Sequence, residues 1–178
     1  MNALTLNNIT KTFNEFTAVD MLSLDVPEGS IYGFIGPNGS GKTTTIRMIM
    51  NILHPDSGDI QILGSPRGSI DNDMVGYLPE ERGLYKKMKI RELLQFYGQL
   101  KTGHGVLTDV DFWLEKLDLT DWGNKKVEAL SKGMSQKVQF IATVVSHPKL
   151  VILDEPFSGL DPVNTDVLLQ AMLELEKN

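Results

Sequence analysis

The segment GPNGSGKT, residues 36–43, decides the fold. It fits the pattern G-x-x-x-x-G-K-[ST] in full, and its glycines let successive backbone N–H groups point into one anion-binding nest. The apolar run Ile31–Ile35 before it predicts a short strand, and Thr44–Leu53 after it has the apolar spacing of a helix. A glycine-rich loop between a strand and a helix N-terminus predicts a binding site for phosphate groups.

Two side chains of this loop have predicted tasks. We expect Lys42 to reach the β- and γ-phosphates of a nucleotide, and the Thr43 hydroxyl to ligate Mg²⁺. A glycine-rich turn that only caps a helix is the alternative, and the strand–loop–helix context argues against it. The residues expected to contact the nucleotide phosphates are Gly36, Pro37, Asn38, Gly39, Ser40, Gly41, Lys42, Thr43 and Thr44.

A second segment with candidate catalytic residues is LVILDEPFSGLDP, residues 150–162. Four apolar residues lead into Asp154 and place it at the tip of a buried strand, where an acid can reach an Mg²⁺ held at the phosphate loop. Glu155 follows beyond this metal ligand, and we expect it to accept a proton from the attacking water. A solvated Asp-Glu pair at a strand end is the alternative.

The composition bounds what kind of protein this is. The 178 residues are 41% hydrophobic and 22% charged, which is typical of a folded domain rather than a disordered chain. The net charge of −6 lacks the basic field of a nucleic-acid binder, and the absence of cysteine excludes disulfides and thiolate metal sites. No run approaches the roughly 20 apolar residues of a membrane span. We therefore expect a soluble chain whose membrane role, if any, comes through a partner.

Strand-like stretches at both ends of the chain, with helical stretches between them, predict an α/β fold. The pattern itself suggests an α/β core that carries a helical insertion. The single domain would comprise core at residues 1–83, the helical subdomain at 84–145 and core again at 146–178. The last segment would end in a helix over Val163–Lys177.

With its motifs in this order, the sequence resembles the ATP-binding subunits of ABC transporters over essentially its whole length. Gly36–Thr43 matches Walker A, LVILDEP matches Walker B with its following glutamate, and SGLD at Ser158–Asp161 matches the D-loop. LSKGM, Leu130–Met134, stands where the family has its LSGGQ signature, which separates this family from other P-loop proteins. The resemblance therefore implies ATP and Mg²⁺ as cofactors, and it argues against a P-loop kinase or GTPase. It also implies a P-loop NTPase core with a mixed sheet, an N-terminal antiparallel β subdomain and an inserted helical subdomain.

In this family two ATP-binding domains dimerise head to tail, with each ATP between Walker A of one copy and the signature of the other. The resemblance implies that the signature contacts the partner copy's ATP and that Asp161 acts in the D-loop. A helix over Lys137–Val145 would direct its N-terminus at the γ-phosphate; an N-capped helix after a loop is the alternative. The signature residues expected to act in trans are Ser131, Lys132, Gly133 and Met134.

This sequence departs from the family pattern at three positions. Lys132 replaces a signature glycine and Met134 replaces the glutamine, a variant similar to that of prokaryotic ABC-2-type exporters such as sodium- and drug-efflux ATPases. Glu80 stands where the Q-loop has glutamine, and its oxygen is expected to ligate Mg²⁺ or hold the attacking water. A solvated charged turn is the alternative for Glu80. Phe13 matches the aromatic residue that stacks on adenine, with Phe16 as the runner-up.

The resemblance implies an ATP hydrolase on the cytoplasmic face of the cell membrane. Its partners would be a second ATP-binding domain, in a homo- or heterodimer, and a separate transmembrane permease, with no nucleic acid. The alternative is a soluble ABC ATPase that acts on ribosomes or DNA. The family also has a strand ending in a histidine after the D-loop, and no histidine follows His147 here. We therefore expect a truncated chain that binds Mg·ATP but hydrolyses it poorly.

Overall fold

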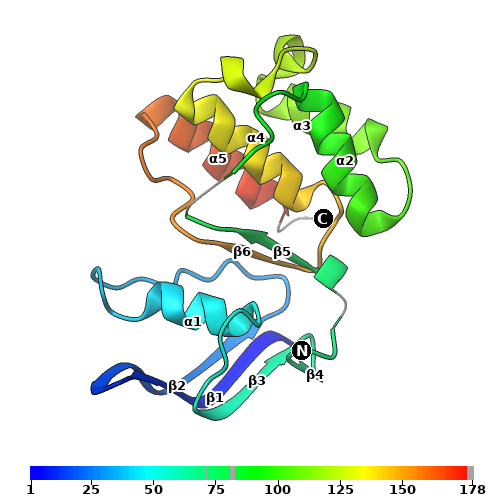
Figure 1. Ribbon diagram of the computed structural model, residues 1–178. Helices are drawn as coiled ribbons and strands as arrows, with labels where there is room; N and C mark the ends of the chain where they lie inside the picture. Colours follow the sequence, from blue (N-terminus) through cyan, green and yellow to red (C-terminus); the bar gives the residue numbers. More distant parts are fainter. Residues whose placement is uncertain (71, 81–82, 176–178) are drawn as a thin grey trace. The chain divides into compact units, whose positions relative to one another are not determined.

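The computed structural model describes residues 1–70, 72–80 and 83–175. It divides into two compact units, residues 1–71 and residues 72–178, each with its own sheet; among the described residues, the first unit has the single α-helix α1 and the second has α2 to α5 (Figure 1). The predicted α/β class, with an antiparallel sheet in the N-terminal part, is confirmed.

The first unit is built on a four-stranded antiparallel sheet with the order β2-β1-β3-β4. The long strands β1 and β2 form a hairpin, and β3 pairs with the other edge of β1. Leu4 lies opposite Val26 on one side and Ile62 on the other, and all three side chains are buried. The strands are β1 Asn2–Phe13, β2 Phe16–Pro27, β3 Ser57–Ile62 and β4 Ser65–Pro66.

Helix α1 spans Lys42–Ile49, so the prediction of a helix over Thr44–Leu53 was wrong at both ends. The helix stops early because Asn51 adopts a left-handed conformation with φ 58°, which turns the chain away from the helix axis. The Arg67 guanidinium then donates to the carbonyl oxygen of Leu53 at 2.8 Å and also to that of Met48. A distant side chain therefore satisfies helix-end carbonyls, which local spacing could not predict.

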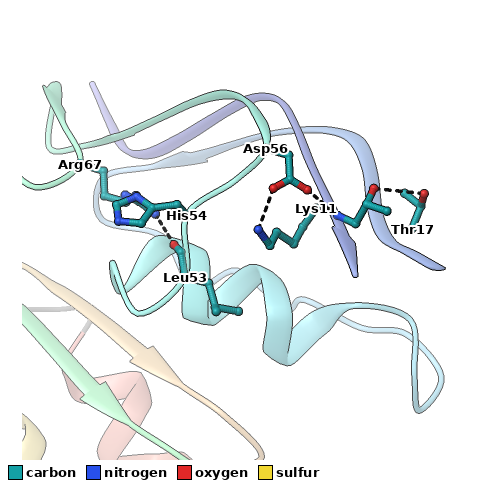
Figure 2. A network of polar contacts seen from close by, with 7 residues as sticks. Lys11, Thr17, Leu53, His54, Asp56 and Arg67 are labelled. Carbon is teal, nitrogen blue, oxygen red and sulfur yellow. Dashed lines mark hydrogen bonds and ion pairs between the residues drawn. The ribbon is translucent and has the colours of Figure 1, made fainter. Parts of the chain in front are cut away.

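The connection from α1 to β3 is fixed by charged side chains (Figure 2). Asp56 accepts hydrogen bonds from Lys11 Nζ and from the Thr12 backbone N–H, both at 2.7 Å. The hydrogen bond from Lys11 is the main cause that holds the pKa of Asp56 below its ordinary value. The Arg67 guanidinium also lies 2.8 Å from His54 Nδ1. The connection is thus held at His54 by Arg67 and at Asp56 by β1.

The prediction of a strand at Ile31–Ile35 was wrong for the part of the chain that the structure describes. These residues form no strand, and the Ile31 and Ile35 side chains are 56% and 94% exposed. A strand exists only where a neighbouring strand accepts and donates its backbone hydrogen bonds. The apolar pattern indicates that the segment favours an extended conformation, but it does not reveal whether a neighbouring strand is there to pair with it.

The second unit contains two parallel strands, β5 and β6, which pair from Val75 opposite Leu150 to Leu78 opposite Leu153. Helix α4 packs against β5, and the contact is close at Gly76, where an added Cβ would lie 2.9 Å from the Thr143 carbonyl oxygen. The elements are β5 Val75–Leu78, α2 Ile90–Thr102, α3 Leu107–Lys116, α4 Lys132–Val144, β6 Leu150–Leu153 and α5 Pro162–Leu175, with short 3₁₀ turns at Asn72–Met74, Thr120–Trp122 and Val127–Ala129.

Helices α2, α3 and α4 enclose the main core of the second unit. Phe140 is fully buried and meets the Trp113 ring edge to face, with 5.7 Å between the ring centroids. The predicted final helix is confirmed up to Leu175, and Lys177 lies outside the described residues. In the part of the chain that the structure covers, no helix has both the length and the apolar character needed to cross a membrane.

Candidate functional site

The phosphate loop Gly36–Thr43 has the backbone geometry that its glycines predict. Gly39 and Gly41 adopt left-handed conformations with φ 81° and φ 86°. At Gly41 an added Cβ would overlap the backbone carbonyl oxygen of Ala18 on β2. Only glycine therefore fits at Gly41, because both its φ angle and its close approach to the sheet exclude a side chain.

The Lys42 side chain folds back onto the backbone of the loop. Its Nζ donates to the carbonyl oxygens of Gly36 at 2.7 Å and Pro37 at 3.0 Å. These acceptors are neutral, and a hydrogen bond to an ionised acceptor is stronger, so a phosphate group would compete for the same ammonium. The lysine is already placed at the mouth of the loop.

The N-terminus of α1 adds to the attraction for an anion. The helix follows Gly41 directly, and Gly41 offers no side chain to cap the first N–H groups. The first turn of the helix contains no acidic residue, and Thr43 and Thr44 are half-buried there. Uncapped N–H groups and the positive end of the helix dipole favour a phosphate at this position.

Phe13 and Phe16 are both accessible for stacking against a base. The two residues face each other across the end of the β1–β2 hairpin, and their side chains are 44% and 64% exposed. The Lys11 ammonium lies 5.6 Å from the centroid of the Phe13 ring. The role of Phe13 in binding adenine stays a prediction, because exposure does not distinguish it from Phe16.

Asp154 and Glu155 have different environments although they are adjacent. Asp154 directly follows β6, its backbone N–H donates to the Leu78 carbonyl at 2.8 Å, and the residue is 4% exposed. Glu155 is exposed and adopts a left-handed conformation with φ 51°. The chain therefore turns sharply between a buried carboxylate and an exposed one, which suits a metal ligand followed by a base.

The oxygen-bearing side chains of the predicted site are of the type that binds Mg²⁺. Within residues 1–70, 72–80 and 83–175, no cluster of three or more His, Cys, Asp or Glu side chains is placed to hold a metal ion. The buried Asp154 carboxylate of the second unit and the Thr43 hydroxyl of the first unit are each hard oxygen ligands, and Mg²⁺ in proteins typically takes one or two such groups and completes its shell with phosphate oxygens and water. Each group taken by itself is therefore of the chemical type that binds Mg²⁺ together with a nucleotide.

The D-loop residue Asp161 caps helix α5. Its carboxylate accepts from the Asn164 backbone N–H at 2.9 Å and from Asn164 Nδ2 at 2.6 Å. The backbone hydrogen bond from Asn164 is the largest cause that lowers the pKa of Asp161 below its ordinary value. Asn164 is a residue that sequence reasoning missed, although an Asp directly before the first turn of a helix is a capping signal.

Ser131 marks the true start of the signature helix. The Met134 backbone N–H donates to Ser131 Oγ at 3.2 Å, which is the geometry of an N-cap. The prediction that this helix begins at Lys137 was wrong, because the cap lets α4 begin at Lys132. Gly133 therefore lies inside the first turn, and the signature itself forms the N-terminus of the helix.

The second unit gathers several predicted residues around one hollow of about 650 Å³. Glu80, Ser131 and Lys132 line it together with Ser158 of the D-loop. Gln136 and Gln139, two amides of α4 that sequence reasoning missed, also line it and are almost fully buried. Polar residues on a helix face that is otherwise apolar were the signal that could have identified them.

The predicted site residues fall into two groups. The phosphate loop and Phe13 belong to the first unit, whereas Glu80, Asp154, Glu155, Asp161 and the signature belong to the second. The first unit carries the phosphate loop, and the second carries the buried Asp154 carboxylate and the exposed Glu155 carboxylate. This set of groups defines a P-loop nucleotide-binding domain.

Comparison with known proteins places the domain in a family. A family model described as "ABC transporter" matches residues 19–158, so the chain belongs to the ABC transporter family as an ATP-binding domain. The chain is 49% identical over 177 residues to the ABC transporter ATP-binding protein YhaQ of Bacillus subtilis, covering 98% of this chain and 59% of that protein. It is 34% identical over 173 residues to the bacitracin transport ATP-binding protein BcrA of Bacillus licheniformis, covering 96% and 56%.

A solved structure supports the same assignment. The chain matches the ADP conformation of MJ1267, an ATP-binding cassette of an ABC transporter, with a TM-score of 0.86 and 26% sequence identity. The match covers 99% of this chain and 78% of that chain. Among the curated relatives, the chain spans only 59% of YhaQ. The activity, substrates and partners of a whole protein are therefore matters for proposal.

Proposed function

We propose that this chain binds Mg·ATP at the phosphate loop Gly36–Thr43 and that the protein hydrolyses ATP to drive a membrane exporter. The observation that carries the proposal is the loop itself, with Gly41 packed against Ala18 and Lys42 held at its mouth. Phosphate would take over the Lys42 ammonium from the Gly36 and Pro37 carbonyls, since it is a charged acceptor. The adenine base would stack on Phe13.

The residues proposed for hydrolysis are Thr43, Glu80, Asp154 and Glu155. Thr43, Asp154 and Glu80 would hold Mg²⁺. The positive charge of the ion would offset the negative charge of the β- and γ-phosphate oxygens. Glu155 would accept the proton of the attacking water, because it follows the buried Asp154 directly and its carboxylate is exposed. General-base catalysis of this kind contributes roughly 10²- to 10⁴-fold to a rate.

We further propose a head-to-tail dimer in which the signature faces the ATP of the partner copy. Ser131 caps the start of α4, so the positive end of the helix dipole and the Gly133 backbone would face the γ-phosphate. Asp161 would contribute from the D-loop.

The transport role rests on the family and on the names of relatives. BcrA is named as a bacitracin transport protein, and the Escherichia coli relative YbhF, 35% identical over 181 residues, as a probable multidrug transporter ATP-binding protein. We propose an exporter of the ABC-2 type, with Lys132 and Met134 as marks of the subgroup. The chain would sit in the cytoplasm against a permease, without nucleic acid.

The test compares ATP with GTP as the substrate, and compares hydrolysis in the presence of Mg²⁺ with hydrolysis in EDTA. Phosphate release by the purified chain is measured with ATP or GTP, each with Mg²⁺ and with EDTA. The proposal expects hydrolysis with ATP that disappears in EDTA. Equal use of GTP would overturn the assignment of ATP. For the transport role, the chain is purified from membranes with its partners; recovery of ribosomes in place of a multi-span membrane protein would overturn it.

A further inference from the structure

The amide of Gln136 is a buried contact between the signature helix and the turn that carries Glu155. Gln136 lies in the second turn of α4 and is 3% exposed. Its Nε2 donates to the backbone carbonyl of Pro156, the residue directly after Glu155. A buried side-chain amide that reaches a loop backbone fixes the loop, because the loss of the contact would leave a buried carbonyl without its donor.

Glu155 needs such a fixed backbone because its conformation is unfavourable. Its φ of 51° lies in the left-handed region, which residues with a Cβ seldom adopt. Pro156 restricts the backbone of Glu155 further, because the proline ring crowds the residue before it. A residue in such a region persists only where its surroundings hold it, and such residues gather at functional sites.

The structure shows what holds the two sides of Glu155. On the N-terminal side, the Asp154 N–H donates to the Leu78 carbonyl at 2.8 Å and continues the ladder of the sheet. On the C-terminal side, the Ser158 N–H donates to the Glu155 carbonyl at 3.1 Å, and Gln136 donates to Pro156. Of these contacts, the one from Gln136 alone comes from a side chain, so it can be removed by substitution.

Two more contacts join the first turn of α4 to the same segment of chain. The Lys132 side chain lies over Gly159, which has φ 71°, so that an added Cβ at Gly159 would overlap its ammonium group. A Cβ added to Gly133 would lie 3.1 Å from Asn164 Nδ2, the group that donates to Asp161. The N-terminal end of α4 therefore packs against the whole turn from Pro156 to Asn164.

We infer that Gln136 is a positioning residue for Glu155 and that it couples the signature helix to the hydrolytic base. Movement of the N-terminal end of α4 reaches Pro156 through the Gln136 amide and changes the aim of the Glu155 carboxylate. A signature that has engaged phosphate thus holds the base of its own copy in place. The inference rests on the proposed function, since it takes Glu155 as the base.

The first test replaces Gln136 by Met, which has a similar length but no donor. ATP hydrolysis by the full chain is measured over a range of ATP concentrations. We expect kcat to fall about 10- to 100-fold, since a small misplacement of a reacting group has an effect of this order, while KM for ATP stays within about twofold. The matched control is Gln139→Met on the same helix, because Gln139 is 9% exposed and its Oε1 has no hydrogen-bond partner in the described residues.

A mutant cycle separates positioning from general structural damage. In the Glu155→Gln background, Gln136→Met should cause no further loss of the residual turnover, because the group it positions is already gone. If Gln136→Met does not fold, Gln136→Asn is used instead; it keeps a polar amide in the buried site but is too short to reach Pro156. A melting temperature for each variant confirms that it is folded.

The outcomes are distinct. If the parent hydrolyses ATP, Glu155→Gln does not, and Gln136→Met matches Gln139→Met in kcat, the inference about Gln136 is wrong and the proposed function stands. Equal further losses in the parent and Glu155→Gln backgrounds would also overturn the inference. If Glu155→Gln hydrolyses ATP at the parent rate, the proposed role of Glu155 fails, and the inference fails with it.

Discussion

The phosphate loop of the first unit and the acidic turn of the second are both short connections that lead into a helix, but different contacts hold them. Within the loop at residues 36–43, Lys42 closes the chain onto carbonyls five and six positions away. The turn from Asp154 to Asp161 is held instead by Gln136, twenty positions before the carbonyl that it contacts. The loop is thus shaped mainly by its own residues and the turn by a distant helix.

A local motif is therefore sufficient to shape the phosphate loop but not the acidic turn. The loop should keep its shape whenever β2 and α1 are present, since Ala18 and Gly41 supply its one close approach to the sheet. The acidic turn should depend on the packing of α4. Substitutions in the loop should therefore change nucleotide binding, whereas substitutions around the turn should change the rate of hydrolysis.

Glu155→Gln should have the largest effect and tests the chemical half of this comparison. The amide keeps the size of the side chain but cannot accept the proton of water, so kcat should fall by roughly 10²- to 10⁴-fold. ATP affinity should remain near that of the parent, because the phosphate loop is unchanged. Phosphate release and binding of a fluorescent ATP analogue measure the two effects; a parent-like kcat would mean that another group is the base.

Gly41→Ala should have the next effect and tests the loop. The added Cβ meets the Ala18 carbonyl and forces an unfavourable φ, so the free energy of unfolding should fall by about 1–3 kcal/mol. ATP affinity should fall as well. Gly39→Ala is the matched control: its φ is 81°, but nothing lies within 4 Å of the new Cβ. Equal destabilisation of the two variants in urea would show that the contact with the sheet is unimportant.

Ser131→Ala should have a smaller effect and tests the start of the signature helix. Loss of the N-cap hydrogen bond to Met134 should lower the free energy of unfolding by about 1 kcal/mol. Ser135→Ala, on the same helix without a cap role, is the control. Denaturant titration compares the two variants, and an equal effect would remove Ser131 as the cap and return the helix start to a later residue.

Asp56→Asn should have the smallest effect, and it tests the connection between α1 and β3. The folded-state pKa of Asp56 is lowered, so the ion pair with Lys11 stabilises the fold above the ordinary pKa of about 3.8 and is lost as the pH falls through the lowered value. The variant should therefore be less stable than the parent at pH 7 but equal to it near pH 2. A difference that persists at low pH would show that the charge of Asp56 is not the cause.

Sequence reasoning predicted the parts of the molecule whose geometry is local. Gly36–Thr43 and the strand before Asp154 were found because each residue has a task within a few positions. The helix starts at Lys42 and Lys132 were missed, because Gly41 and Ser131 set them through backbone conformation and capping. Ile31–Ile35 was predicted as a strand, but strand formation depends on a neighbour that periodicity does not reveal.

Contacts between residues far apart in the sequence could not be predicted from the sequence. No local pattern links Gln136 to Pro156, Arg67 to the end of α1, or Asn164 to Gly133. Each of these contacts depends on how helices and loops pack, which a motif does not encode. The chemistry of the candidate site was thus predicted from residue types, whereas the means of positioning Glu155 emerged only from the fold.

Binding of ATP by Lys42→Ala decides whether Gly36–Thr43 is the ATP site. Equilibrium titration with Mg²⁺ and a labelled ATP compares the parent, Lys42→Ala and the control Lys149→Ala, which removes an exposed lysine outside the loop. Loss of a charged hydrogen bond to phosphate should weaken binding by about 10- to 100-fold in Lys42→Ala and leave Lys149→Ala like the parent. An unchanged affinity in Lys42→Ala would contradict the assignment of Gly36–Thr43 as the ATP site.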